Sequence, residues 1–136
     1  GVDEVIFELN GVSLDTISSG EYNRLRLALL TSMSEFDIVD NGILFLDEID
    51  ANLSGKESDA ISKVLNKLSD SYQIFAISHQ PQLTSSANQH FLVDKIDGKS
   101  FVKELNNQER MTEIARMISG EKVTLEALEF AKNLLK

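Results

Sequence analysis

Asp47 and Glu48 are the first residues that could do chemistry, because both follow an apolar run, Ile43 to Leu46. An unbroken run of this kind is typical of a buried strand in a parallel sheet, and ligands bind beyond the carboxyl ends of such strands. Side chains of neighbouring strand residues diverge, so the two acids would act differently. Asp47 suits Mg²⁺, directly or through water, and Glu48 suits a base that activates water. The alternative interpretation is that Asp47 and Glu48 are two ordinary acids at a solvated strand end, since such acids would give the same sequence pattern.

A run of small residues before an acid, Ser18, Ser19, Gly20 and Glu21, stands at the predicted start of a helix. Free amide groups and the helix dipole attract anions at such a start. Ser18 and Glu21 also fit a capping box, in which both groups satisfy the helix's own backbone. Both interpretations stay open, because a capped helix start still presents a hydroxyl and amides to a phosphate.

His79 follows a second apolar run, Tyr72 to Ile77, and comes directly after Ser78. At the end of a strand beside the acids, this imidazole could donate a hydrogen bond to a terminal phosphate, although a single histidine is more often structural. His90 has no acidic or histidine partner close to it in sequence, so we interpret it as structural.

Hydrophobic spacing predicts the elements that position these residues. We expect a strand over Val5–Leu9 that ends at the Asn10-Gly11 turn, then a helix from Glu21 to about Met33. That helix should bury one face, Leu25, Ala28 and Leu29.

The region 43–77 predicts a parallel strand–helix–strand unit. Ser54 and Glu57 form a capping box that opens the intervening helix, whose apolar residues recur at helical spacing: Ile61, Val64, Leu65 and Leu68.

The last third predicts a hairpin and two helices. Strands Phe91–Val93 and Phe101–Val102 flank Asp97-Gly98, a hairpin signal. A helix runs from about Asn107 to Ile118, with Ile114, Met117 and Ile118 inward. Gly120 ends it, and the second helix starts after Thr124 and carries Leu125, Leu128 and Leu135.

Composition limits the class of protein. The chain has 136 residues, a formal net charge of −9, 42% hydrophobic residues, no cysteine and two histidines. These values argue against wholesale disorder, disulfides, thiolate metal sites and histidine-rich metal cages. No apolar run approaches the ~18 residues of a membrane span, and no secretory leader is recognisable. The acidic balance argues against a surface that grips DNA phosphates throughout.

The order of the motifs resembles the second half of an ABC-type ATPase head. Ile17–Glu21 resembles the LSGGE signature, with Ser19 in place of its first glycine, and Ile43–Glu48 resembles Walker B with its catalytic glutamate. Asp50–Gly55 resembles the D-loop, and His79 falls where the switch histidine belongs.

Further stretches are similar to the RecN family of bacterial DNA repair proteins. Leu53-Ser54-Gly55 resembles that family's D-loop, and the remaining matches are the stretches Ser78–Gln82, His90–Lys95 and Glu109–Leu135. Departures are Ser19 and Asn52, which stand where glycines are expected. A side chain at Ser19 crowds a backbone that would approach phosphate closely.

The resemblance implies an α/β fold: a partial P-loop NTPase lobe of ABC or SMC type, with a mostly parallel sheet flanked by helices and a C-terminal helical pair. Residues 1–136 would form a single domain, the C-terminal half of the head. No Gly-x-x-x-x-Gly-Lys-Ser/Thr phosphate loop occurs in these residues, so the chain alone is expected to be inactive.

The resemblance also implies a role for each site residue. Asp47 would serve Mg²⁺, Glu48 would activate water, and His79 would contact the γ-phosphate of ATP. The signature residues would act on ATP held by the partner head: Ser18, Ser19, Gly20 and Glu21. Asn52 and Ser54 would communicate between the two ATP sites.

The implied partners are the N-terminal half of the same head, a second head in an ATP-dependent homodimer, and DNA through the intact protein. A membrane is not expected. The implied location is the bacterial cytoplasm, in association with the nucleoid. Two alternatives stay open: a DExD-type helicase core, since residues 47–50 fit that box, and a non-enzymatic acidic interaction domain.

Overall fold

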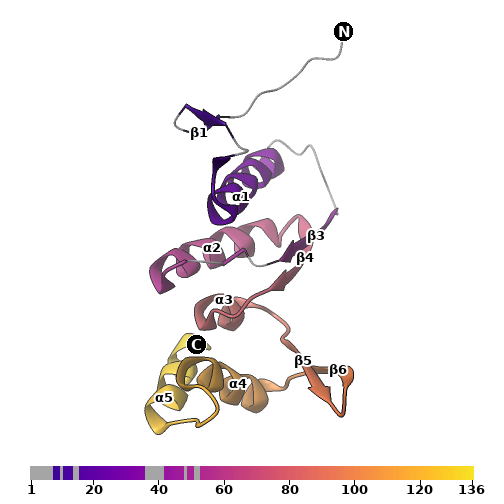
Figure 1. Ribbon diagram of the computed structural model, residues 1–136, viewed down its shortest axis with the longest axis vertical. Coiled ribbons are helices and arrows are strands. Elements are labelled where there is room, and N and C mark those ends of the chain that lie inside the picture. The colour runs from indigo at the N-terminus through magenta and orange to yellow at the C-terminus, as the bar shows by residue number, and fades with distance from the viewer. Residues whose placement is uncertain (1–7, 10, 14–15, 36–41, 48, 51–52) are drawn as a thin grey trace.

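A computed structural model describes residues 8–9, 11–13, 16–35, 42–47, 49–50 and 53–136 (Figure 1). Within these residues, a short hairpin opens the chain at its indigo end, and a pair of helices closes it at its yellow end. Their bounds are β1 (Glu8–Leu9), β2 (Val12–Ser13), α1 (Ser19–Glu35), β3 (Gly42–Asp47), α2 (Gly55–Leu68), β4 (Tyr72–Ile77), α3 (Pro81–Ser86), β5 (Phe91–Ile96), β6 (Lys99–Glu104), α4 (Asn107–Ser119) and α5 (Leu125–Leu134).

The first strands form a short antiparallel hairpin, in which Glu8 pairs with Ser13 and Leu9 with Val12. Gly11 adopts a φ of 76° in the turn, a conformation that favours glycine. The expected strand is confirmed for its last two residues, whereas positions 5–7 and 10 lie outside the described residues.

Helix α1 buries a different face from the one that the spacing suggested. Leu27 is 3% exposed and Leu30 packs beside it, whereas Leu29 is 39% exposed and Ala28 is exposed. The expected inward face of Leu25, Ala28 and Leu29 is therefore wrong. Apolar residues occur on several sides of this helix, so contact with α2 decides which side is buried.

The predicted parallel strand–helix–strand unit is present. β3 and β4 are parallel from Gly42 opposite Tyr72 to Asp47 opposite Ile77, and α2 crosses between them (Figure 1). Ser54 caps α2 in a complete capping box with Glu57, as the sequence predicted.

Only one face of this strand pair is buried. Leu44 and Leu46 face the core, whereas Phe45 is 69% exposed and Ile77 is 65% exposed. The Phe45 and Phe75 rings stack on the open side, with centroids 5.1 Å apart. The apolar runs had predicted strands buried on both faces, so that expectation is wrong for this side of the pair among the described residues.

The main core lies between α1, α2, α3 and the covered face of β3–β4. Apolar side chains from all of these elements meet there: Leu27, Leu44, Leu46, Ile49, Leu53, Ile61, Leu65, Leu68, Tyr72 and Leu83. The expected inward residues of α2 are confirmed, with Val64 only partly buried. Helix α3, which the sequence had left as an unassigned segment, contributes Leu83.

The hairpin β5–β6 and the helix pair α4–α5 follow. Asp97 and Gly98 have φ values of 48° and 77°, as expected for a tight two-residue turn that suits twisted strands. The helices bury a second cluster, Ile114, Ala115, Ala127 and Ala131. Ile118, expected inward, is 39% exposed, because Ala115 and Ile114 take the contact positions against α5.

These elements confirm an α/β fold with a small parallel sheet and a C-terminal helical pair. The described strands form three two-stranded sheets, of which only β3–β4 is parallel, so a larger, mostly parallel sheet is not seen within these residues. No helix in the described part of the chain is long and apolar enough to cross a membrane. The single-domain expectation for residues 1–136 stays a prediction.

Candidate functional site

The parallel register of β3 and β4 brings Asp47 and His79 to the same edge. Asp47 ends β3 opposite Ile77, and His79 follows Ile77 by one residue, Ser78. Asp47 is exposed, and the His79 side chain is 69% exposed. This edge is open to solvent rather than covered by the described chain, as a ligand site requires. Glu48 lies outside the described residues.

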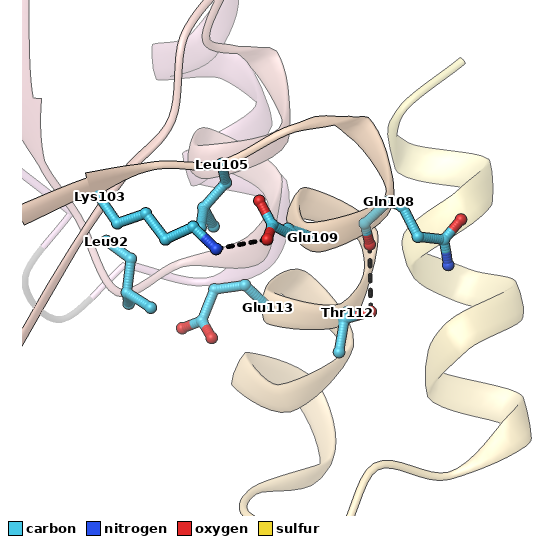
Figure 2. Close-up of a pocket in the computed structure, with 7 residues that line it drawn as sticks. All are labelled: Leu92, Lys103, Leu105, Gln108, Glu109, Thr112 and Glu113. Carbon is cyan, nitrogen blue, oxygen red and sulfur yellow. Dashed lines mark hydrogen bonds and ion pairs between the residues drawn. The ribbon is translucent and has the colours of Figure 1, made fainter.

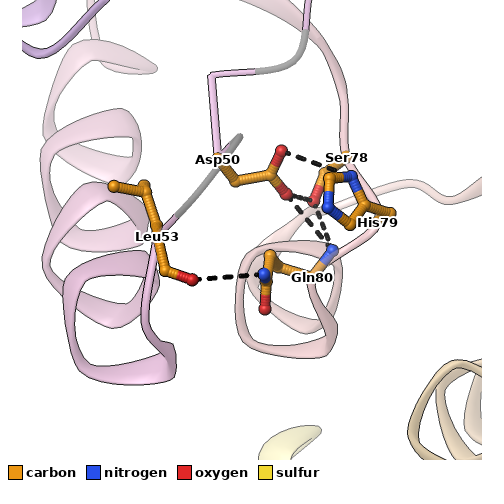
Figure 3. A network of polar contacts seen from close by, with 5 residues as sticks. All are labelled: Asp50, Leu53, Ser78, His79 and Gln80. Carbon is orange, nitrogen blue, oxygen red and sulfur yellow. Dashed lines mark hydrogen bonds and ion pairs between the residues drawn. The ribbon is translucent and has the colours of Figure 1, made fainter. Parts of the chain in front are cut away.

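Beside His79 lies a buried carboxylate, Asp50, that the sequence had not singled out as a site residue. Its exposure is 0%. The Ser78 hydroxyl and the Gln80 amide both donate to Asp50 Oδ2, the amide over 3.2 Å (Figure 3). His79 Nδ1 lies 3.8 Å from Asp50 Oδ1. A signal existed, since Asp50 is the last acid of the DExD-like run, but its partners lie 28 to 30 residues away in sequence.

The same network reaches the start of α2. The Gln80 side-chain amide donates to the carbonyl oxygen of Leu53 over 3.4 Å (Figure 3). The next residue, Ser54, donates its hydroxyl to Glu57 over 2.8 Å. The hydrogen bond from the Ser54 backbone amide, followed by that from its hydroxyl, lowers the pKa of Glu57. Ser54 therefore serves its own helix in this structure, and Asn52 lies outside the described residues.

At the start of α1, Ser18 and Glu21 form the reciprocal bonds of the expected capping box. The Ser18 amide and hydroxyl donate to Glu21 Oε2 over 3.0 and 2.8 Å. These bonds, the backbone one first, lower the pKa of Glu21. Ser18 and Ser19 are exposed, whereas Gly20 is buried. No hydrogen bond or ion pair among the described residues joins this helix start to Asp47 or His79, so the two predicted halves of the site are separate here.

Asp47 fits a magnesium ion that arrives with a nucleotide. The part of the chain that the structure describes holds no group of three metal-ligating side chains. Mg²⁺ in nucleotide sites uses one or two carboxylates together with waters and phosphate oxygens, so a single exposed carboxylate is a suitable protein ligand.

A separate open pocket lies between the hairpin β5–β6 and α4 (Figure 2). The Lys103 ammonium pairs with the Glu109 carboxylate at its rim. The complete lining is Leu92, Lys103, Leu105, Gln108, Glu109, Thr112 and Glu113. None of the predicted site residues lines it, and its charged side chains are already paired: Lys103 with Glu109, and Glu113 with Arg116.

Comparison with known proteins finds strong sequence relatives. The chain is 50% identical to the DNA repair protein RecN of Helicobacter pylori over 136 residues. The aligned region covers 100% of this chain and 26% of that protein. It is 39% identical to RecN of Rickettsia typhi, over 99% of this chain and 26% of the relative. No model of a known protein family matches the chain.

Two solved structures have the same fold. One, from work on ATP-driven dimerization and DNA-stimulated activation of SMC ATPases, has a TM-score of 0.61 and 22% identity, over 81% of this chain and 66% of that chain. The other, an SMC head bound to the C-winged helix domain of ScpA, has a TM-score of 0.59 and 23% identity, over 71% of this chain and 29% of that chain. By sequence the chain is a RecN-like segment, and its fold is that of SMC heads.

The RecN-like segment spans about a quarter of the length of the curated relatives it matches. Of the three interpretations that the sequence left open, the relatives and the shared fold support the RecN-like head rather than a helicase core or an acidic interaction domain. The roles of individual motif residues stay predictions.

Proposed function

We propose that the intact RecN-like protein binds and hydrolyses ATP at a site completed by two heads, and that this segment supplies the hydrolytic edge. The observation that supports this most directly is the β3–β4 pair. It places Asp47 and His79 at one solvent-open edge of a parallel sheet, where ligands bind in α/β folds.

In this proposal each residue at the edge has a distinct task. Asp47 holds Mg²⁺, which neutralises phosphate charge when bound. Glu48 accepts a proton from the attacking water. His79, exposed at the same edge as Asp47, donates a hydrogen bond to the γ-phosphate.

The signature residues act on a nucleotide bound by the other head. Ser18 and Ser19 are exposed at the start of α1, where amides and the helix dipole favour phosphate. Gly20 lets the backbone pass closely, and Glu21 holds the helix start through its bonds to Ser18. The phosphate loop comes from the N-terminal half of the head, because these 136 residues contain none.

We further propose that two such heads form an ATP-dependent homodimer in which Asn52 and Ser54 connect the two sites. The two solved structures described above are of SMC proteins, and one comes from work on ATP-driven dimerization. The curated relatives are DNA repair proteins, so the intact protein acts on chromosomal DNA in the bacterial cytoplasm. The net charge of −9 favours DNA contacts elsewhere in the intact protein.

The decisive experiment is Glu48→Gln in the intact protein. Hydrolysis should fall by about 100-fold or more, because the general base is lost, while ATP binding persists and the ATP-bound dimer accumulates. Phosphate release measures the first effect, and light scattering with ATP and Mg²⁺ measures the second.

Glu126→Gln is the matched control, because Glu126 is an exposed glutamate on α5 outside the predicted site. It should hydrolyse ATP like the wild type. Unchanged hydrolysis in Glu48→Gln would contradict the role of Glu48.

A further inference from the structure

Asp50 is a buried acid whose two carboxylate oxygens have different surroundings. Oδ2 accepts from the Ser78 hydroxyl and the Gln80 amide. Oδ1 is buried and accepts no hydrogen bond among the described residues. The imidazole of His79 faces this oxygen, with Nδ1 at 3.8 Å (Figure 3).

A buried carboxylate with a vacant oxygen is costly unless a donor completes it. Two donors already fix the orientation of Asp50 through Oδ2, so Oδ1 has a defined direction toward His79. The imidazole is largely exposed, and exposed side chains adjust their rotamers readily. A movement of less than about 1 Å would bring Nδ1 within hydrogen-bond distance of Oδ1.

The chemistry of the pair determines which ring nitrogen carries the proton. An ionised carboxylate only accepts hydrogen bonds, so the nitrogen that faces it must be N–H. A neutral imidazole held in this way carries its proton on Nδ1, and Nε2 then points away from Asp50. An acid that fixes the tautomer and the orientation of a working histidine is a recurring device in enzymes.

We propose that Asp50 is a positioning residue that joins the loop after β3 to the loop after β4 and holds Nδ1–H of His79 toward its own Oδ1, with Nε2 directed to the nucleotide. Without nucleotide the neutral ring is the Nδ1–H tautomer. The hydrogen bond that His79 donates to the γ-phosphate then uses a second proton, taken up from solvent by Nε2 when the nucleotide binds, so the bound ring is an imidazolium. The part of this inference that concerns the nucleotide rests on the proposed ATPase function. The part that concerns the tautomer stands on the Asp50 contacts alone. Asp50 itself touches no substrate; it acts through His79 and Ser78.

Because Gln80 also bonds the Leu53 carbonyl, the same carboxylate connects His79 to the start of α2. Movement of the segment that precedes α2 would therefore be transmitted to the imidazole through Asp50 and Gln80. Asp50 is thus the residue through which the D-loop region and the histidine respond together.

The first test measures the tautomer directly. The intact protein is labelled with ¹⁵N-histidine without nucleotide, and the His79 ring signals are identified by their loss in His79→Gln. The ¹⁵N chemical shifts of the neutral ring should show Nδ1 protonated. A predominant Nε2–H tautomer in the wild type would overturn the proposal, and this measurement needs no Asp50 variant to fold.

The second test uses Asp50→Asn, which keeps the shape but turns one acceptor into a donor. The His79 signals should shift toward the Nε2–H tautomer, and kcat for ATP should fall by about 10- to 100-fold while KM changes by less than about twofold. Asp70→Asn, an exposed acid in the turn after α2, is the control and should change neither.

The double variant Asp50→Asn with His79→Gln should be no slower than His79→Gln alone, because both changes remove one shared interaction. Wild-type tautomer signals in a folded Asp50→Asn variant would overturn the proposal even if turnover fell. Failure of the wild-type protein to hydrolyse ATP would instead overturn the proposed function, and the tautomer would still be tested.

Discussion

At the scale of single residues, His90 shows how burial sets a protonation state. Its Nδ1 is buried without a hydrogen-bond partner in the described part of the chain. Arg110 lies near it and donates to the carbonyl oxygens of Ser85 and Ala87 over 3.4 and 2.6 Å. The pKa of His90 is lowered mainly by burial and, to a lesser extent, by the positive charge of Arg110. The negative charge of Glu113 opposes this with a smaller effect. The structural role that the sequence suggested for His90 agrees with this neutral, half-buried ring.

His90 should therefore make the chain less stable in acid. Its folded pKa lies below the ordinary value of 6.5, so below 6.5 the unfolded chain binds more protons than the folded chain, and stability falls as the pH drops toward the folded pKa. Urea unfolding at about pH 5.5 and about pH 7.5 measures this. The wild type should lose more stability between the two pH values than His90→Gln does, and equal losses would contradict the assignment.

At the scale of elements, local hydrogen bonds define where helices begin. The pairs Ser18–Glu21, Ser54–Glu57 and Asn106–Glu109 each exchange bonds across three residues. Such pairs depend on nearby residues only, which is why the first two were predictable from sequence. The buried face of α1 depended on α2, a distant element, and was not predictable.

The cap of α4 gives a direct test of this local contribution. Asn106 Oδ1 accepts the Glu109 amide over 3.0 Å, so Asn106→Ala should lower the free energy of unfolding by about 1 kcal/mol. Asn107→Ala, at the first helical residue, is the control and should be neutral or slightly stabilising because alanine favours helix interiors. Urea denaturation compares the two; equal effects would exclude a cap contribution.

At the scale of the whole molecule, the described chain has two buried clusters and one open apolar strand face. The cluster around Leu65 and Leu68 supports the β3–β4 edge, and the cluster around Ile114 joins α4 to α5. Phe45 and Phe75 stack on the uncovered side of β3–β4. The segment therefore holds the edge that carries Asp47 and His79 in place, and these 136 residues contain no phosphate loop.

The purified 136-residue chain should accordingly show no ATP turnover above the buffer background, because the amide cradle and lysine that hold the phosphates are absent from it. The intact protein, assayed for phosphate release under the same conditions, is the positive control. Turnover by the purified chain would contradict the assignment of this segment as one part of a shared site.

The sequence alone predicted the motifs, the caps of α1 and α2, the Asp97-Gly98 hairpin turn and the parallel strand pair, because each depends on neighbouring residues or on a short hydrophobic period. It thereby placed Asp47 and His79 at one edge. Only the tertiary structure decided that Asp50 is buried beside His79, since its partners Ser78 and Gln80 are distant in sequence and meet it through the β3–β4 register. It also decided which sides of α1 and β3–β4 are covered, because burial depends on the packing partner and not on the apolar residue itself.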